Sequence, residues 1–216
     1  MGYNVDAVRS FEERIFSFET PIVDPDGSHH EFNQGLHGQK VDFGNITEGS
    51  ELYSTWIDVQ TGFIAAQYPR ELWQSMVLAG VAYGTNGVAR DVALALGDGV
   101  QSIETTKNDS GLPEPTTEAT EQLETINPQL VVIVEDVITL GTNSVSTLTS
   151  IHTHRPPGLK QIEVVGTLLR SMPQRLIELN VAYAALIKRP MKVYAPDACR
   201  REGFCAEGWQ LTPYKR

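Results

Sequence analysis

The segment that most constrains the fold is residues 131–144, with the sequence VVIVEDVITLGTNS. Residues 130–134 form a continuous apolar run rich in β-branched side chains, which is typical of a strand buried on both faces. Two adjacent acids, Glu135 and Asp136, come next, and a short loop containing Gly141 leads into a helix expected over residues 145–151. A buried strand followed by a loop and a helix predicts a parallel sheet covered by helices.

The rest of the chain alternates in the same manner, which favours an α/β class with a central parallel sheet of about five strands. Residues 5–18 have helical spacing, and two short strands around a Gly-Ser turn are expected within residues 41–60. The segment DPDGSHHEFNQGLHGQ is rich in turn residues and is expected to be weakly structured. Further strands are expected to end just before the turn at residues 80–87 and to cover 100–105, 160–169 and, last, KVYAP. Further helices are expected over 88–97 and 173–187.

Length and charge narrow the class of protein. A chain of 216 residues accommodates one large domain, or one domain with a small appendage. It carries 17 Lys and Arg against 27 Asp and Glu, a net charge of −10, which argues against a nucleic-acid or anionic-membrane surface. The opening MGYNVDAVRSFEER lacks the apolar core of a signal peptide, and no apolar run approaches the roughly 20 residues of a membrane span. With only two cysteines, a cytoplasmic location is expected.

The loop after the acidic pair has the chemistry of a phosphate site. Ligands of open α/β sheets bind beyond the carboxyl ends of the strands, and a glycine loop entering a helix offers backbone N–H groups to an anion. Thr139 and Thr142 add hydroxyl donors. Glu135 and Asp136 cannot bind phosphate, but they can accept hydrogen bonds from ribose hydroxyls or hold a hydrated Mg²⁺. The segment therefore suits a sugar that carries a phosphate at one end.

VVIVEDVITLGT resembles the phosphoribosyl pyrophosphate (PRPP) motif of type I phosphoribosyltransferases: apolar strand, two acids, two apolar residues and a Thr/Gly loop. FGNITEGSELYSTWID and VAYGTNGVARDVALALG resemble segments of the orotate phosphoribosyltransferases, and APDACRREGFCAEGWQLTP resembles a degraded C-terminal tail of some orotate-type sequences. The resemblance covers most of residues 42–189. It implies a three-layer type I phosphoribosyltransferase-like fold with a central parallel sheet and a small hood, divided as hood elements 1–55, core 56–190 and a C-terminal strand and tail 191–216.

The resemblance also implies site residues and partners. PRPP and orotate would be the substrates, orotidine 5′-phosphate and pyrophosphate the products, Mg²⁺ would be held through PRPP and water, and a homodimer is expected. Catalysis would involve Lys107 and Asp136. The implied PRPP contacts are Glu135, Asp136, Thr139, Leu140, Gly141, Thr142, Asn143, Tyr83 and Gly84. The implied base contacts are Trp56 and Ile57 on an aromatic strand, Thr139, and Arg170, with Arg175 as its rival.

The chain departs from this family where catalysis needs positive charge. A leaving pyrophosphate gathers negative charge, which cations must offset. The segment that matches the family's basic loop, ETTKNDSGLPEPTTEATEQLET, has one base, Lys107, among six acids: Glu104, Asp109, Glu114, Glu118, Glu121 and Glu124. Two alternatives to an orotate enzyme therefore stay open: a PRPP- or nucleotide-binding regulatory protein with little catalysis, and a phosphoribosyltransferase for another base.

Several residues invite simpler interpretations. The pairs His29–His30 and His152–His154 lie in polar segments, with no Cys or carboxylate at ligand spacing, and are expected to be surface histidines. Cys199 and Cys205 form a single pair without a second one, and are expected to be free thiols. The tryptophans are expected mainly to pack, and the acidic run 114–124 to form a solvated face.

Overall fold

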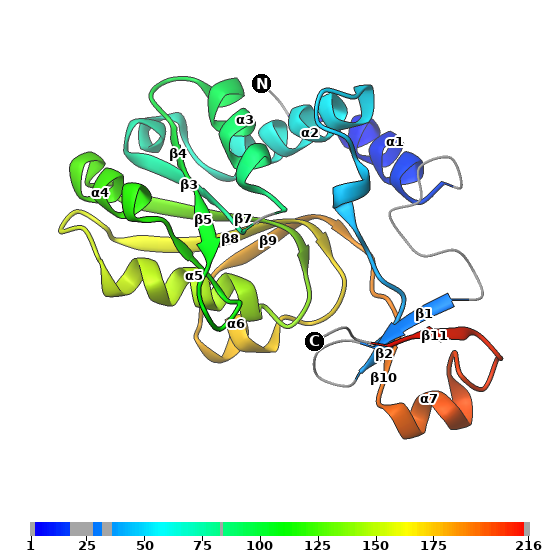
Figure 1. Ribbon diagram of the computed structural model, residues 1–216. Coiled ribbons are helices and arrows are strands. Elements are labelled where there is room, and N and C mark those ends of the chain that lie inside the picture. Colours follow the sequence, from blue (N-terminus) through cyan, green and yellow to red (C-terminus); the bar gives the residue numbers. More distant parts are fainter. Residues whose placement is uncertain (1–2, 18–27, 32–35, 83, 214–216) are drawn as a thin grey trace.

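The computed structural model describes residues 3–17, 28–31, 36–82 and 84–213. Its core is a five-stranded sheet of order β4-β3-β7-β8-β9, and every neighbouring pair in it is parallel (Figure 1). The expected parallel sheet is thus confirmed. Its strands are β3 (Met76–Gly80), β4 (Gln101–Ile103), β7 (Leu130–Ile138), β8 (Gln161–Leu169) and β9 (Tyr183–Lys188).

Helices cover both faces of this sheet, which gives the expected three layers (Figure 1). On one face lie α1 (Val5–Ile15), α2 (Glu51–Gln67) and α3 (Asn86–Leu96), and on the other α4 (Thr117–Ile126) and α5 (Thr142–Thr153). The alternation along β7 divides the core, because Val132 and Val134 join the first cluster and Val131 and Ile133 join the second. The short elements are η1 (Phe43–Asn45), η2 (Arg70–Ser75), α6 (Gln174–Glu178), β5 (Thr105–Lys107) and β6 (Pro113–Pro115).

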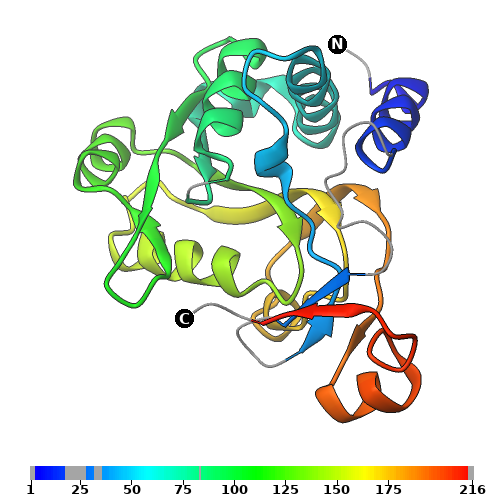
Figure 2. The ribbon, with the colours of Figure 1, turned by 45° about the vertical axis from the view of Figure 1, so that its right-hand side comes forward.

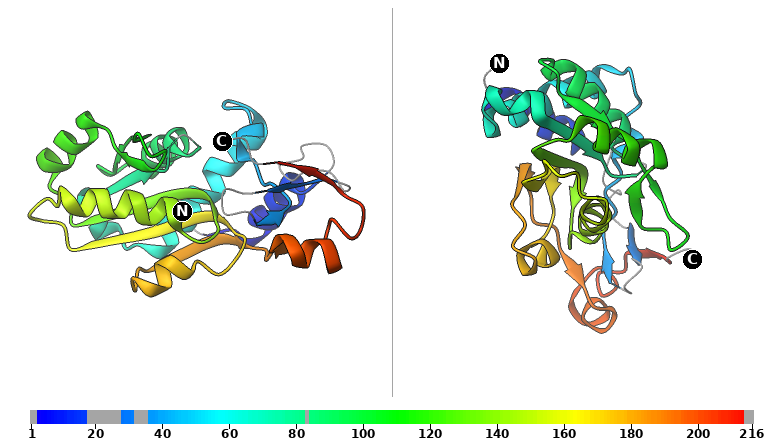
Figure 3. Two further views of the ribbon diagram at one scale, coloured as in Figure 1. Left: turned by 60° about the horizontal axis from the view of Figure 1, so that its bottom comes forward. Right: turned by 90° about the vertical axis from the view of Figure 1, so that its left-hand side faces the viewer.

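A second, small sheet forms a hood beside the core (Figures 2 and 3). It combines β1 (Ser28–Glu31) and β2 (His37–Gly38) with β10 (Val193–Tyr194) and β11 (Gln210–Thr212), in the order β10-β2-β1-β11, and α7 (Pro196–Glu202) packs near β10. Segments from both ends of the chain therefore meet in it. The helix α1 lies against the core instead, and the expected division between residues 55 and 56 falls within α2.

The expectation of two strands in residues 41–60 is wrong, because this stretch forms η1 and most of α2. The hydroxyl of Ser50 accepts a hydrogen bond from the Tyr53 N–H and caps the helix. Buried residues on nearly every side of α2, among them Trp56 and Val59, removed the amphipathic signal that identifies a helix.

The expected helix over residues 173–187 is also wrong beyond its first turns. Only α6 is helical; Asn180 then adopts a left-handed conformation with φ +53°, and the apolar run 183–187 becomes β9 at the edge of the sheet. The fifth strand of the core is therefore β9, while KVYAP supplies β10 of the hood. A short apolar run fits either a helix or a strand, and the left-handed break at Asn180 separates the two.

One of the histidines expected on the surface is buried. His29 on β1 has no exposed area, whereas His152 and His154 are exposed as expected. His37 on β2, which was not among them, is also buried, at 4% exposed. The turn-rich segment that contains His29 and His37 thus supplies two hood strands. Among the described residues, no helix is long and apolar enough to cross a membrane.

Candidate functional site

The loop between β7 and α5 has the conformation of an anion site. Gly141 is the N-cap of α5 with φ +79°, and a side chain there would place its Cβ 2.8 Å from Leu176 Cγ. Only glycine accommodates both the left-handed backbone and this close approach. The first N–H groups of α5, from Thr142 and Asn143 onward, have no acceptor within the helix and carry the positive end of its dipole. The Arg175 N–H donates to the Leu140 carbonyl at 3.2 Å and ties α6 to the loop.

Gly141→Ala is expected to lower stability by about 2 kcal/mol, from left-handed strain and the contact with Leu176, and to weaken PRPP binding about tenfold or more. Denaturant unfolding and calorimetric titration measure the two effects. Gly49→Ala is the matched control, because Gly49 has φ +81° with open space around its Cβ position. PRPP affinity equal to that of the unchanged protein in Gly141→Ala would count against a phosphate contact at this loop.

Glu135 lies within β7, on the face turned toward α5, and is buried. The Ser144 hydroxyl on the first turn of α5 donates a hydrogen bond to its carboxylate. Burial raises the pKa of Glu135 to about 8; the Ser144 bond opposes this rise and the charge of Asp136 adds to it. The carboxyl group is therefore held at an energetic cost at neutral pH, which is typical of functional sites.

Asp136 follows on the same strand but on the other side, against the loop between β3 and α3. A Cβ at Gly84 would lie 3.1 Å from Asp136 Oδ2, so glycine allows this loop to approach the carboxylate. The Val137 N–H donates to Asp136 Oδ1 at 2.8 Å. Burial raises the pKa of Asp136; that hydrogen bond lowers it, and the charge of Asp42 raises it further.

The β3–α3 loop is fixed by side chains that the sequence analysis did not select. The Thr85 hydroxyl, buried, bonds the Val134 carbonyl at 2.5 Å and accepts the Val81 N–H at 2.7 Å. Asn86 and Thr105 exchange hydrogen bonds of 2.8 and 3.1 Å, which join this loop to β5. The Thr-Asn pair before a predicted helix was the available signal for this role. Tyr83, expected to contact PRPP, lies outside the described residues.

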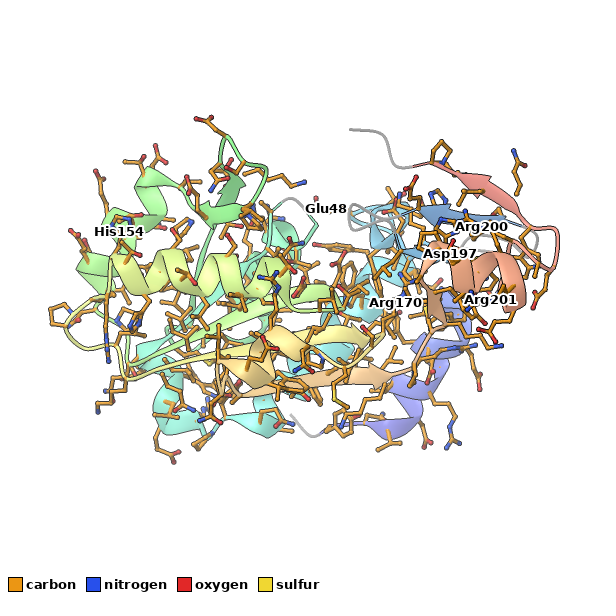
Figure 4. The ribbon with its side chains drawn as sticks, turned by 90° about the horizontal axis from the view of Figure 1, so that it is seen from below. Glu48, His154, Arg170, Asp197, Arg200 and Arg201 are labelled. Atoms are coloured by element: carbon orange, nitrogen blue, oxygen red, sulfur yellow. The ribbon has the colours of Figure 1, made fainter. Side chains whose placement is uncertain are left out.

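The two arginines proposed for base recognition differ in environment. Arg170 follows β8 at the carboxyl edge of the sheet and is only 4% exposed, while Arg175 is exposed at the start of α6. The Arg170 N–H bonds the Ile138 carbonyl at 3.0 Å, and its own carbonyl accepts the Met191 N–H at 3.0 Å. Figure 4 places Arg170 at the end of the core that adjoins the hood. Arg170 is therefore the more buried and the more firmly held of the two.

Trp56 lies in the core on α2 and not on a strand, as shown above. Its indole N–H donates to the Thr167 hydroxyl at 2.8 Å, its ring packs 4.9 Å from that of Phe43, and it is 2% exposed. Ile57 is buried in the same helix. The expected packing role of Trp56 therefore has direct support, and a contact with a base has none in this arrangement.

The acidic segment forms an antiparallel hairpin, β5–β6, followed by α4. Lys107 is exposed at the end of β5, opposite Pro113. Ala119 and Leu123 anchor α4 to the core, and Glu118, Glu121 and Glu124 are exposed, as expected for a solvated face. The segment from β5 to α4 thus carries exposed negative charge on α4.

The donor set at the edge of the sheet suits a hydrated Mg²⁺ bound with a phosphorylated ligand. Asp136 offers a carboxylate oxygen, a hard ligand of the kind Mg²⁺ prefers. Glu135 is a weaker donor at neutral pH, because its raised pKa keeps it largely protonated. Of the two acids, Asp136 is therefore the better oxygen donor for a cation.

Comparison with known proteins finds similarity in structure but none in sequence. No protein-family model matches the chain, and no curated protein matches it in sequence. Orotate phosphoribosyltransferase from Aeropyrum pernix superposes with a TM-score of 0.56 at 16% identity, over 85% of this chain and 92% of that one. The Mycobacterium tuberculosis enzyme bound to PRPP gives 0.53 at 18%, over 85% and 96%. Adenine phosphoribosyltransferase from Trypanosoma brucei, in complex with AMP, pyrophosphate and ribose-5-phosphate, gives 0.53 at 18%, over 87% and 82%. The chain has the type I phosphoribosyltransferase fold.

Proposed function

We propose that this protein binds PRPP and transfers its 5-phosphoribosyl group to orotate, giving orotidine 5′-phosphate and pyrophosphate. The observation that carries the proposal is the glycine-capped start of α5 beside the Glu135–Asp136 pair, at the carboxyl edge of a parallel sheet. Solved structures of the same fold with PRPP, or with AMP and pyrophosphate, support the class of ligand.

Each part of the site has a defined task in this reaction. The 5′-phosphate is held by the N–H groups of the loop 139–143 and by the dipole of α5. Asp136 and Glu135 accept hydrogen bonds from the ribose hydroxyls. A ring nitrogen of the base loses its proton to water and attacks the anomeric carbon, and the bond from this carbon to the pyrophosphate oxygen breaks with its electrons leaving on the pyrophosphate. Lys107 would offset part of that charge, and Mg²⁺, when bound, would supply further positive charge.

The proposal is tested by incubating the purified protein with PRPP and Mg²⁺ and separately with orotate, adenine and uracil. Formation of orotidine 5′-phosphate is the expected result, and a folded protein that forms no nucleotide from any base overturns it. Gel filtration with light scattering tests the homodimer that is part of the same proposal.

Arg170→Ala is expected to lower kcat/KM for orotate about 100-fold or more, because a buried guanidinium would lose its pairing with the carboxylate of orotate. The PRPP affinity should not change, since the phosphate loop is intact. Arg175→Ala is the matched control on the exposed neighbour and should retain the orotate rate. An unchanged orotate rate in Arg170→Ala, or a loss confined to Arg175→Ala, would reassign base recognition.

A second function has a specific observation in its favour. The hairpin and α4 present acids where departing pyrophosphate needs cations, which suits a PRPP- or nucleotide-binding regulator with little catalysis. Calorimetric titration separates the two functions: PRPP binding without turnover of any base supports the regulator. An enzyme for another base, such as adenine or uracil, is identified directly by the panel of bases.

A further inference from the structure

Four potential metal ligands meet in the hood, although they are far apart in the sequence. His29 of β1, His37 of β2, Cys199 of α7 and Cys205 of the following turn each place one ligand atom within 4.8 Å of the other three. The residues come from both ends of the chain, and His29 and Cys199 are 170 positions apart. Three of the four are buried and Cys205 is partly buried.

The measured separations fit a single ion at the centre of the cluster. His29 Nε2 lies 3.2 Å from Cys205 Sγ and 3.8 Å from Cys199 Sγ, and His37 Nδ1 lies 3.4 Å from Cys205 Sγ. In a tetrahedral zinc site with Zn–S near 2.3 Å and Zn–N near 2.0 Å, neighbouring ligand atoms lie about 3.5 Å apart. We propose that the hood binds one structural Zn²⁺ through His29, His37, Cys199 and Cys205.

The surroundings of the cluster support this assignment. The Cys205 N–H donates to Cys199 Sγ at 3.2 Å, a bond that stabilises a thiolate ligand from outside the coordination shell. The ring of Phe204 packs 5.6 Å from His29, and Trp209 packs 4.7 Å from Phe204, so aromatic side chains shield the cluster from water. Two thiolates and two imidazoles are a zinc donor set, whereas Mg²⁺ takes oxygen ligands.

The hood also needs an additional source of stability. Within the described ranges, its buried apolar side chains are Cys199 and Phe204, and the two buried clusters of the core do not extend into it. Its strands are two to four residues long. A unit with so small a core commonly requires a metal or a disulfide. Four protein ligands leave no open position on zinc, so the ion would hold the hood together and not take part in catalysis.

The test begins with metal analysis of the full chain purified without chelators. About one zinc per chain is expected, and replacement by Co²⁺ should give the visible d–d bands and thiolate charge-transfer absorption of a tetrahedral Cys₂His₂ site. Removing the metal with a chelator should expose residues 190–213 to protease while the core remains resistant. These readouts are independent of catalysis, so they stand or fall separately from the proposed phosphoribosyl transfer.

His37→Ala and Cys205→Ser should each reduce zinc content to well below one per chain. The matched controls are His30→Ala, next to a ligand on β1, and His154→Ala, at the opposite end of the molecule from α7 (Figure 4). The controls should keep the metal. If a ligand variant does not fold, the Co²⁺ spectrum of the unchanged protein decides. A protein that takes up neither zinc nor cobalt, or that contains a Cys199–Cys205 disulfide, overturns the proposal.

Discussion

Replacing both acids of the PRPP motif, in the double variant Glu135→Gln and Asp136→Asn, is expected to abolish PRPP binding and leave the fold intact. Each acid is proposed to accept hydrogen bonds from ribose hydroxyls as a carboxylate when PRPP is bound, because those bonds favour the ionised form. Hydrogen bonds to a charged partner contribute about 1.5–3 kcal/mol each. Losing both should weaken affinity at least about 100-fold. Neither substitution changes the side-chain volume appreciably. Both sites favour a neutral side chain, because the pKa values of Glu135 and Asp136 are raised.

Calorimetric titration with PRPP and Mg²⁺ measures the loss, and circular dichroism checks the fold. The control is the double variant Glu118→Gln and Glu121→Gln, which removes the same charge from the exposed face of α4. It should bind PRPP as tightly as the unchanged protein, or slightly more tightly, because it reduces long-range repulsion. Undiminished affinity in the motif variant would refute the ribose assignment.

Glu135→Gln alone is expected to raise stability, and to do so increasingly as the pH rises. The folded protein holds the pKa of Glu135 at about 8 against an ordinary value of 4.5. Below about pH 4.5 both states are protonated and the group costs nothing. Between the two values only the unfolded state releases the proton, so stability falls as pH rises and the penalty is complete above about pH 8. Its full size is on the order of 5 kcal/mol.

Glutamine stays neutral and can still accept the Ser144 hydrogen bond, so the variant escapes this penalty. Thermal unfolding should show that Glu135→Gln is little more stable than the unchanged protein at about pH 5 and much more stable at about pH 8.5. The control Glu121→Gln, on the exposed surface, should show no gain in stability at either pH. A gain that did not depend on pH would mean that the buried charge is not its source. Higher stability combined with weaker PRPP binding would indicate a site that keeps its acid for function.

Local patterns in the sequence were sufficient for the core. The apolar run predicted β7, Gly141 predicted the start of α5, and the apolar spacing predicted α3. Each of these signals lies within a single strand or one to two helical turns, and all three predictions are confirmed. The prediction of secondary structure failed where the pattern was ambiguous. The helix α2 is buried on most sides, so its hydrophobic periodicity was weak. The apolar run 183–187 is short enough to form either a helix or a strand. In both cases packing against the sheet decided the outcome.

At the proposed site, the sequence indicated the residues but not their environments. It placed Glu135 and Asp136 side by side, whereas the fold directs one toward Ser144 and the other toward Gly84. It indicated Arg170 as the better match for base recognition with Arg175 as its rival, and the structure buries Arg170 and exposes Arg175. The pKa of Glu135 depends on how deeply β7 is covered by α5, which no motif records.

The sequence by itself determined that a buried strand of this chain ends in two acids and a glycine loop before a helix, because strand, acids, glycine and helix are consecutive. Only the tertiary structure decided the hood. His29 and His37 have no cysteine near them in sequence, and Cys199 and Cys205 have no histidine, so nothing in the sequence grouped the four. Pairing β1 with β11 and β2 with β10 closes the distance of about 170 residues between them. Ligand geometry depends on spatial proximity, and strand pairing between the two ends of the chain supplies it.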